Sequence, residues 1–445
     1  KALAAAKKAS ASGPVTLEVP KGSYHFFSRF ATRKACHFSN ATESDSDALR
    51  TIAINIEDIP NLTIDGQAST FLMRGKMTLL VAQRCTDFTL KNLTFDFPRP
   101  TFSEMTVLEK GDGHFTAQVH PDSTYQITNG KRILWIGDDW QDYHNLAQHF
   151  AHTNRTVWRG PDPTANASKI TDLGDRKLRI EVPQNQVNQT EVGRTLQFRN
   201  MRRDQAGMWF NHCKNVSLTD LTIRAMHGFG ILGQFSENFT YTRLVVAPDP
   251  ASGRTCASPA DITHFSGCKG LIRLDQCHLT AAHDDAMNVH GTHLRVIEKL
   301  APNQFKLRFM HAQSWGFQAY FPGDDIEFVS QATMLPIGKA KVTAVEMTED
   351  PRVQIITTDT PAPDALKINA DVIENLTWTP SVHVSNTILE QLPTRGFLFT
   401  TRRPILVEKT KFIHPNMSAI LLEDDARGWY ESGPVHDLTI RDCDF

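Results

Sequence analysis

One pattern of apolar and polar positions recurs along the chain, h-x-h-x-x-h-x-h, in which h is an apolar or small residue. Apolar and polar residues alternate within each half of the pattern, as they do in short β-strands that are buried on one face. We therefore expect these segments to form strands whose apolar residues point into one shared core. The copies are Phe88/Leu90/Leu93/Phe95, Val216/Leu218/Leu221/Ile223, Phe239/Tyr241/Leu244/Val246, Ile272/Leu274/Cys277/Leu279, Val382/Val384/Thr387/Leu389, Ile405/Val407/Thr410/Phe412 and Leu438/Ile440/Cys443/Phe445.

The spacing of the copies indicates a solenoid. The copies that begin at Val216 and Phe239 are 23 residues apart. The next interval, from Phe239 to Ile272, is about ten residues longer. Such spacing, with one coil per repeat and an extra loop in some coils, is typical of a β-helix. A second strand is expected eight residues after the last apolar position of four copies, at Ile231, Met287, Phe397 and Ile420. The sequence thus predicts an all-β fold, a right-handed parallel β-helix.

Two intervals between copies are far longer than one coil. The interval from Phe88 to Val216 and the interval from Ile272 to Val382 each exceed the length of four coils. The additional residues read as short strands with hairpin turns, which predicts two small inserted β-barrel-like domains beside the binding face. The predicted organisation is an N-terminal cap with the first coils at 1–100, an inserted β domain at 101–205, central coils with the candidate acids at 206–291, a second inserted β domain at 292–375, and C-terminal coils at 376–445.

Composition narrows the class of partner. The 445 residues are 40% hydrophobic, have a formal net charge of −2 and contain no block of Lys or Arg, unlike a protein that binds nucleic acid or acidic lipid. No apolar run of about 18 residues is present, so no membrane-spanning helix is expected. Seven cysteines without a C-x-x-C pair argue against a disulfide framework or a structural zinc site. We expect a neutral partner and neither a metal nor a cofactor; the sequence indicates no oligomeric state.

The two ends of the chain leave its targeting open. It begins at Lys1 without an initiator Met, and it stops inside the last copy of the repeat. We expect the natural termini, with any signal peptide, to lie outside this sequence, and we expect a periplasmic or secreted protein.

Three acids break the repeat where the fold does not require them. When the coils are aligned, Gly228 and Phe229 occupy the positions that Asp284 and Asp285 occupy later, and Asp261 lies 23 residues before Asp284. Neighbouring parallel strands are about 4.8 Å apart, so the three carboxylates are expected in one patch. Crowded carboxylates cannot all ionise easily, which yields the acid and base that glycoside hydrolysis needs. An inverting pair with carboxyls about 6.5–9.5 Å apart would take one member from the Asp pair and Asp261 as the other.

Three alternative roles for the acids stay open at this point. In the simplest one they are solvated turn aspartates. In another they bind Ca²⁺ in a β-helix polysaccharide lyase, with Arg254 or Arg395 within reach as the base. In the third the protein is a non-enzymatic β-helix adhesin that only binds glycans.

Further polar side chains are expected to line the same cleft. With Met287 and Val289 pointing inward, Asn288 and His290 point outward. The position of His290 within its strand is filled by Gln234, Thr400 and Glu423 in other coils. His264 and His283 flank the acids as candidate donors to sugar hydroxyls, and Trp429 is a candidate for stacking on a sugar ring.

The segments "ADITHFSGCKG" (260–270) and "AHDDAMNVHG" (282–291) resemble those of glycoside hydrolase family 110, the α-1,3-galactosidases that include enzymes trimming blood group B. The inserted β-domains and the segments at 394–412 and 429–433 are similar as well, so the resemblance covers most of the chain. It implies a metal-independent, inverting exo-hydrolase of terminal α-linked galactose, with Asp261, Asp284 and Asp285 as catalytic acids. Arg395 joins the polar residues above as a substrate contact.

The chain is also similar to the polygalacturonases, which place one Asp a coil before an Asp pair. It lacks their later Gly-His-Gly and Arg-x-Lys motifs and has no evident basic cleft for a uronate. A neutral sugar in an oligosaccharide or polysaccharide with terminal α-galactose is therefore the preferred partner. An endo-acting polygalacturonase-like hydrolase remains the alternative.

Overall fold

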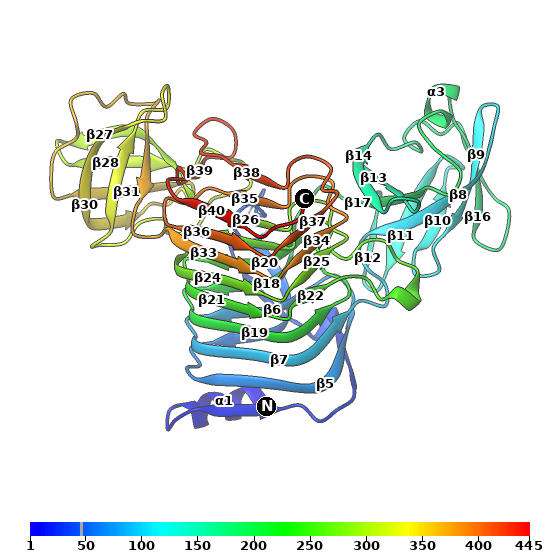
Figure 1. The fold of residues 1–445 in the computed structure, drawn as a ribbon, viewed down its shortest axis with the longest axis horizontal. Coiled ribbons are helices and arrows are strands. Elements are labelled where there is room, and N and C mark those ends of the chain that lie inside the picture. Colours follow the sequence, from blue (N-terminus) through cyan, green and yellow to red (C-terminus); the bar gives the residue numbers. More distant parts are fainter. Residues whose placement is uncertain (45–47) are drawn as a thin grey trace.

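The computed structural model describes residues 1–44 and 48–445 as a parallel β-helix with two inserted β-domains (Figure 1). Helix α1 (Ala2–Ser10) lies at the N-terminal end of the solenoid, next to its first strand. One wall is a 14-stranded sheet. Its strands are β1 (Val15–Glu18), β2 (Ser23–Phe27), β5 (Leu62–Arg74), β7 (Thr86–Asp96), β19 (Lys214–Ile223), β21 (Glu237–Thr242), β22 (Val245–Val246), β24 (Lys269–Asp275), β25 (His278–Thr280), β33 (Pro380–Ser385), β34 (Ile388–Glu390), β36 (Ile405–Glu408), β37 (Lys411–Ile413) and β40 (Leu438–Arg441).

The second wall is a 10-stranded sheet that supports the candidate acids. Apart from an antiparallel edge strand, β39 (Glu431–Ser432), and the N-terminal pair β3–β4, its strands are paired in parallel. The strands in order are β3 (Thr32–Ala35), β4 (Leu49–Glu57), β6 (Thr78–Gln83), β18 (Ala206–Asn211), β20 (Phe229–Gln234), β23 (Thr263–Ser266), β26 (Met287–Thr292), β35 (Phe397–Phe399) and β38 (Ile420–Leu422).

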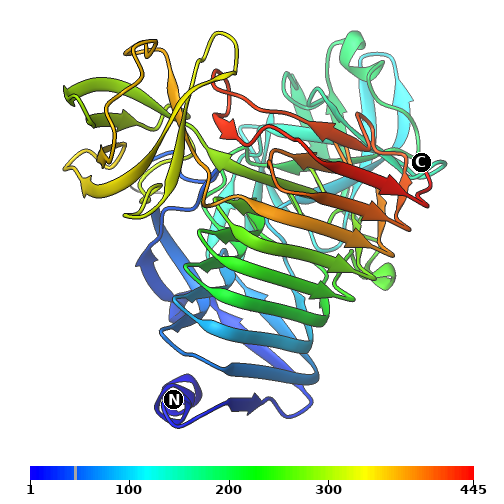
Figure 2. The ribbon, with the colours of Figure 1, turned by 60° about the vertical axis from the view of Figure 1, so that its left-hand side comes forward.

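The predicted stacking of the repeats is confirmed residue by residue. Val216 pairs with Phe88 on one side and with Phe239 on the other, and the same register continues to Leu438 at the last coil. In the second wall, Ile231, Thr263, Met287, Phe397 and Ile420 lie in register. The coils therefore climb as one ladder, which Figure 2 shows from the side.

The inward residues of both walls form a single core along the solenoid. Phe88, Val216, Phe239 and Ile272 belong to one cluster of buried side chains, together with Met287 of the other wall. All seven cysteines are free, and Cys277 is buried in this core while Cys443 is half-buried, so the expected role of these thiols as small apolar side chains fits their positions. Among the described residues, no helix is long and apolar enough to cross a membrane.

The first insertion leaves the solenoid after β7 and returns at β18. It contains a seven-stranded antiparallel sheet and a three-stranded one around a core of its own. The strands are β8 (Ser103–Gly111), β9 (His114–Val119), β10 (Thr124–Thr128), β11 (Arg132–Gly137), β12 (Trp140–Asp142), β13 (Leu146–Ala151), β14 (Thr156–Gly160), β15 (Lys169–Asp172), β16 (Lys177–Glu181) and β17 (Thr195–Arg199), with the short helix α3 (Gln184–Val187).

The second insertion leaves the solenoid after β26 and returns at β33. It forms a closed barrel with a separate apolar core. The two insertions flank the C-terminal half of the solenoid on opposite sides (Figure 1). The barrel strands are β27 (Leu294–Ala301), β28 (Gln304–Arg308), β29 (Asp325–Val329), β30 (Pro336–Met347), β31 (Val353–Thr358) and β32 (Val372–Asn375).

The tight stacking of coils yields a prediction at Gly230. A Cβ at this position would lie 2.2 Å from the carbonyl oxygen of Asp261 and 2.4 Å from that of Ile262 in the next coil. Gly230→Ala should therefore destabilise the protein by about 1–3 kcal/mol, because the backbone of the next coil must shift. Urea unfolding followed by circular dichroism measures the loss.

The matched control for this variant is Gly22→Ala, whose Cβ would meet only the Tyr24 ring at 3.4 Å. The urea concentration at the midpoint of its unfolding should stay close to that of the unchanged protein. Equal stability of the two variants would show that the coils at Gly230 are less closely packed than described.

Candidate active site

The candidate acids lie where the chain enters strands of the second wall. Because Thr263 pairs with Met287 and Met287 with Phe397, the residue two positions earlier in each coil falls into one column. That column holds Phe229, Asp261, Asp285 and Arg395. The coil is one residue longer here than predicted, so Asp261 aligns with Asp285 and not with Asp284. The neutral Phe229 in the same column agrees with the view that the fold does not require an acid there.

The three carboxylates meet in a buried patch. One oxygen of each lies within 4.8 Å of an oxygen of the other two. Asp261, Asp284 and Asp285 are only 4%, 8% and 1% exposed, so these are not solvated turn aspartates. The 4.8 Å limit joins the closest oxygens, whereas the about 6.5–9.5 Å of inverting pairs separates whole carboxyl groups, so the expected spacing stays a prediction.

Asp284 is held as an anion by two guanidinium groups. Arg159 Nη2 lies 2.9 Å from its Oδ1, and Arg203 Nη2 lies 3.0 Å from its Oδ2. Burial opposes ionisation, but the Arg203 and Arg159 charges outweigh it and lower the pKa of Asp284. Arg159 comes from β14, so the first insertion contributes directly to the site.

Asp285 accepts hydrogen bonds from the next coil. Thr394 Oγ1 donates at 2.6 Å and the Arg395 backbone N–H at 3.1 Å to Oδ1, while Arg395 Nη2 donates at 2.6 Å to Oδ2. Burial and the neighbouring Asp284 and Asp261 carboxylates raise the pKa of Asp285 to about 8. Burial and Asp284 also raise the pKa of Asp261 to about 7. Because the two groups interact, they titrate as a unit, and at neutral pH that unit retains at least one proton.

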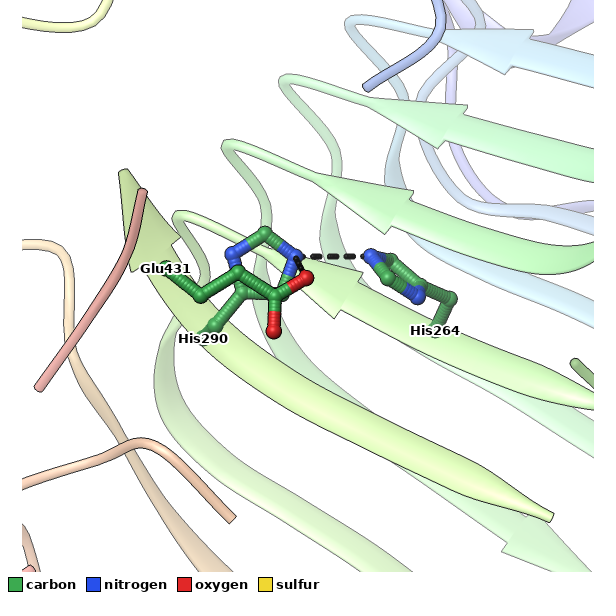
Figure 3. Close-up of side chains that lie close together, drawn as sticks. All are labelled: His264, His290 and Glu431. Atoms are coloured by element: carbon green, nitrogen blue, oxygen red, sulfur yellow. Dashed lines mark hydrogen bonds and ion pairs between the residues drawn. The ribbon is translucent and has the colours of Figure 1, made fainter. Parts of the chain in front are cut away.

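Two histidines and a glutamate lie directly behind Asp261. Its Oδ2 is 2.8 Å from His264 Nδ1, and His264 Nε2 is 2.7 Å from His290 Nε2. Glu431 Oε1 approaches His290 Nε2 at 3.5 Å (Figure 3). Burial opposes ionisation of Glu431, but His290 and His264 outweigh burial and lower its pKa.

A pocket opens onto these groups, and several parts of the chain form its wall. Trp429 stacks on His311 of the second insertion, with ring centroids 4.0 Å apart, so that insertion braces the aromatic wall. Asn40 of the N-terminal segment donates to Glu431 at 2.8 Å. The lining residues are Asn40, Arg159, Arg203, Asp261, His264, Asp284, Asp285, Asn288, Arg395, Leu398, Glu423, Asp425, Trp429 and Glu431.

Two sets of these side chains have donor atoms suited to a metal ion. One is Asp261, Asp284 and Asp285, and the other is His264, His290 and Glu431. In the first set the oxygens of Asp284 and Asp285 already face arginines or a threonine hydroxyl. A hard cation would have to displace these partners, so the aspartates do not have the free oxygens of a Ca²⁺ site.

The comparisons with known proteins identify the family. Residues 103–196 match the model of GLAA-B beta-barrel domain I, and residues 304–373 match that of GLAA-B beta-barrel domain II. Alpha-1,3-galactosidase A of Bacteroides thetaiotaomicron is 39% identical over 448 residues, which cover 100% of this chain and 78% of that protein. The chain belongs to glycoside hydrolase family 110.

Other similar proteins agree with this assignment of the family 110 chain. Alpha-1,3-galactosidase A of Bacteroides fragilis is 38% identical over 98% of this chain and 72% of its own length. Alpha-1,3-galactosidase B of Phocaeicola vulgatus is 32% identical over 99% of this chain and 76% of its own length.

A solved structure, the A-module of the Azotobacter vinelandii mannuronan C-5 epimerase AlgE6, covers 99% of this chain and 94% of its own at 10% identity, with a TM-score of only 0.18.

Most of the site residues predicted for this family 110 chain meet in the pocket. They are Asp261, Asp284, Asp285, His264, Asn288, Arg395, Glu423 and Trp429. Asn288 lines the pocket and donates from Nδ2 to Glu431 at 3.3 Å, while its Oδ1 is buried. Both ring nitrogens of His264 are engaged by Asp261 and His290. His264 therefore supports Asp261, and the expectation that it donates to a sugar hydroxyl does not fit this geometry.

Three predicted contacts lie behind the pocket wall. Gln234 Oε1 accepts from the backbone N–H of Ser39 at 3.0 Å, and His283 Nε2 lies 2.9 Å from Gln197 of the first insertion. His290 is 1% exposed and lies behind two pocket-lining residues, His264 and Glu431. Arg254 pairs with Asp96 of β7 at 2.9 Å, away from the candidate acids. This ion pair joins the loop that contains Arg254 to β7.

Sequence reasoning missed the residues that the repeat does not place. Arg159, Arg203, Asn40, Asp425 and Glu431 all line the pocket. Arg159 lies in an insertion and Arg203 in the segment that leads back from it, so coil alignment gives no information on either. The nearest available signal was the cluster of charges "RNMRRD" at 199–204, directly before a strand of the acid-bearing wall.

Opposite pKa shifts predict opposite effects of two Asp→Asn variants on stability. The pKa of Asp261 is raised in the folded protein, so the Asp261 carboxyl stabilises the fold only while it is protonated. This stabilisation is fully present below the pKa of an unfolded Asp, about 3.9, and is lost as pH rises through about 7. Asp261→Asn should therefore be more stable than the unchanged protein at pH 8, by at least about 1 kcal/mol, and should show no gain near pH 4.

Asp284→Asn should do the reverse. Its pKa is lowered, so its contribution is present above the unfolded value and is lost as pH falls. The substitution leaves Arg159 and Arg203 without their anion, and the variant should be less stable at pH 8 by about 1–3 kcal/mol. Chemical unfolding at pH 4 and pH 8 tests both variants. The same sign for both at pH 8 would contradict the described charge arrangement.

Proposed function

We propose that this chain is an exo-α-1,3-galactosidase that removes terminal α-linked galactose from glycans in a single inverting displacement. The observation that supports it most strongly is the buried set of three carboxylates within 4.8 Å of one another, in a pocket of a chain 39% identical to an alpha-1,3-galactosidase. Glycoside hydrolysis needs one carboxyl group that is protonated and one that is ionised, and the surroundings of these acids push their pKa values apart.

We assign the role of proton donor to Asp261. The oxygens of Asp285 accept from three donors, which stabilise the ionised form. Although the pKa of Asp285 is raised further than that of Asp261, the pair titrates as a unit. We assign its shared proton to Asp261 because Asp261 faces a histidine nitrogen to which it can donate, whereas Asp285 accepts from three donors. From Asp261 the proton passes to the glycosidic oxygen as the bond to the sugar C1 breaks.

Asp284 is assigned the role of base. Its two arginine partners keep it ionised, and it is the most exposed of the three acids. Two carboxylate oxygens within 4.8 Å are close enough for one water molecule to bridge them with ordinary hydrogen bonds of about 2.7–2.8 Å. In this mechanism Asp284 and Asp285 hold the water, Asp284 takes its proton, and the oxygen attacks C1.

The charges in the pocket favour a neutral sugar. The three guanidinium groups that line it are each paired with Asp284 or Asp285, so their charge is already balanced by a carboxylate of the protein. This speaks against polygalacturonase-like action. A lyase would need a basic side chain that abstracts a proton, and the guanidinium of Arg395 is instead paired with Asp285 through Nη2 at 2.6 Å.

A purely glycan-binding adhesin would gain nothing from this arrangement. Burying mutually repelling carboxylates opposes folding unless their reactivity is used. Sugar binding alone is achieved by neutral hydroxyl and amide partners and an aromatic ring.

Retention through a covalent intermediate is the second candidate. It would need two carboxyl groups about 5–5.5 Å apart, and oxygens of these acids lie within 4.8 Å of one another. A nucleophilic oxygen, however, must bond C1 itself, whereas a base only takes a proton on its remaining lone pair. The arginine and threonine partners of Asp284 and Asp285 crowd the first role more than the second, so inversion fits the site better.

The choice of leaving group tests the assigned roles. An activated aryl α-galactoside needs no proton on its leaving oxygen, whereas an α-1,3-linked galactobiose does. Asp261→Asn should lower kcat/KM for the galactobiose by about 10²–10⁴-fold but for the aryl substrate by less than about tenfold. Asp284→Asn should lower both by about 10²–10⁴-fold.

Equal losses on the two substrates in Asp261→Asn would contradict its role as the acid. The linkage is tested in the same assays, with α-1,4- and α-1,6-linked galactobiose as comparisons. Absence of galactose release from every α-galactoside by the unchanged protein would reject the proposed function itself.

A further inference from the structure

We propose that His264 and His290, with the backbone carbonyl of Gly291, form a directional proton chain that keeps the proton on Asp261. The proposal rests on the function assigned to Asp261 above. In it, the two histidines are positioning residues that act on the substrate only through Asp261.

Three consecutive contacts build the proton chain. Asp261 Oδ2 and His264 Nδ1 are 2.8 Å apart, His264 Nε2 and His290 Nε2 are 2.7 Å apart, and His290 Nδ1 lies 2.5 Å from the Gly291 carbonyl oxygen. The imidazoles meet edge to face, with centroids 4.8 Å apart (Figure 3). Both histidines are at most 1% exposed, so no solvent competes for their ring nitrogens.

The far end of the proton chain fixes its direction. A carbonyl oxygen only accepts, so His290 Nδ1 must donate to Gly291. In a neutral His290, Nε2 then carries the lone pair and accepts from His264 Nε2–H. A neutral His264 has its own lone pair on Nδ1, which can only accept from Asp261. The proton chain is complete only when Asp261 Oδ2 bears a proton.

The neutral state of His264 follows from its surroundings. Burial and the adjacent His290 lower the pKa of His264 well below its usual range. Ionising Asp261 would require His264 to turn its N–H toward the carboxylate, which leaves two lone pairs facing each other at 2.7 Å unless His290 takes up an additional proton. The proton chain therefore resists loss of the proton from Asp261.

Other charged groups also act on the proton chain. Burial, Asp284 and Glu431 raise the pKa of Asp261, and Arg203 and Arg395 lower it. Glu431 Oε1 lies 3.5 Å from His290 Nε2, and the charges of Glu431 and Asp284 oppose the lowering of the His264 pKa. The Glu431 oxygens also accept from Asn40 and Asn288, which disperses the charge of Glu431.

A metal ion is the competing occupant of this cluster. Nitrogens bound to one zinc ion at about 2.0–2.1 Å in a tetrahedral site are about 3.3 Å apart. The two Nε2 atoms are 2.7 Å apart, which is a hydrogen-bond distance. A shared proton therefore fits the cluster, and a metal does not fit without movement of the rings.

The pH profile of His290→Gln tests the proposal. Hydrolysis of α-1,3-galactobiose by the unchanged protein should decline above about pH 7, where Asp261 loses its proton. The glutamine side chain of this variant is not expected to extend the proton chain to the Gly291 carbonyl. Its amide N–H can instead donate to His264 Nε2, and His264 Nδ1–H can then donate to an ionised Asp261. The alkaline limb of kcat/KM should move to lower pH by at least about one unit, with about tenfold lower kcat/KM at pH 7.

Two comparisons separate this effect from general damage. The activated aryl substrate needs no acid, so its kcat/KM in His290→Gln should stay within about threefold of the unchanged protein. His383→Gln removes a histidine that pairs with Glu408 at 2.9 Å on the outside of the solenoid, and its pH profile should be unchanged. An alkaline limb that does not move in folded His290→Gln would overturn the proposal.

Neutron diffraction of the unchanged protein gives a test that does not depend on a variant. The expected deuterium positions are Asp261 Oδ2, His264 Nε2 and His290 Nδ1. Deuterium on His264 Nδ1 beside an ionised Asp261, or a metal ion between the Nε2 atoms, would overturn the proposal. Lack of galactosidase activity with the expected deuterium positions would reject the proposed function and leave the proton chain itself supported.

Discussion

The site depends on the balance between crowded carboxylates and the arginines that surround them. Asp261, Asp284 and Asp285 are almost fully buried, and their repulsion would disfavour folding if all three ionised without partners. Arg159 and Arg203 hold an anion at Asp284, and Arg395 and Thr394 donate to Asp285. The third carboxyl, Asp261, faces a histidine, and in the proposed mechanism it carries the proton. Acid and base thus differ because their partners differ.

The solenoid makes this balance possible because every coil presents the same positions to the same edge. One column brings Asp261, Asp285 and Arg395 together, although the whole second insertion separates Asp285 from Arg395 in the sequence. The insertions then add what the coils cannot supply. The first brings Arg159 to Asp284, and the second supports Trp429 through His311.

Much of this arrangement was predictable from the sequence. The apolar period predicted both walls of the β-helix, and replacement of Gly228 and Phe229 by acids in a later coil identified the site. The register around Asp261 was missed by one residue because a single extra residue in that coil does not disturb the apolar pattern. Arg159, Arg203 and Glu431 were missed because they belong to segments between coils, whose paths have no period. Their positions depend on tertiary contacts that one sequence does not reveal.

The charge arrangement also bears on the stereochemistry of the reaction. The closest oxygens of the acids lie within 4.8 Å of one another, and a donor already faces each oxygen of Asp284 and Asp285, which crowds a bond to C1 more than the uptake of a proton from water. The most direct test is proton NMR of the hydrolysis of an α-galactoside, recorded before the released galactose mutarotates. We expect β-galactose to appear first. Initial appearance of α-galactose would contradict single-step inversion and would require one aspartate to bond C1.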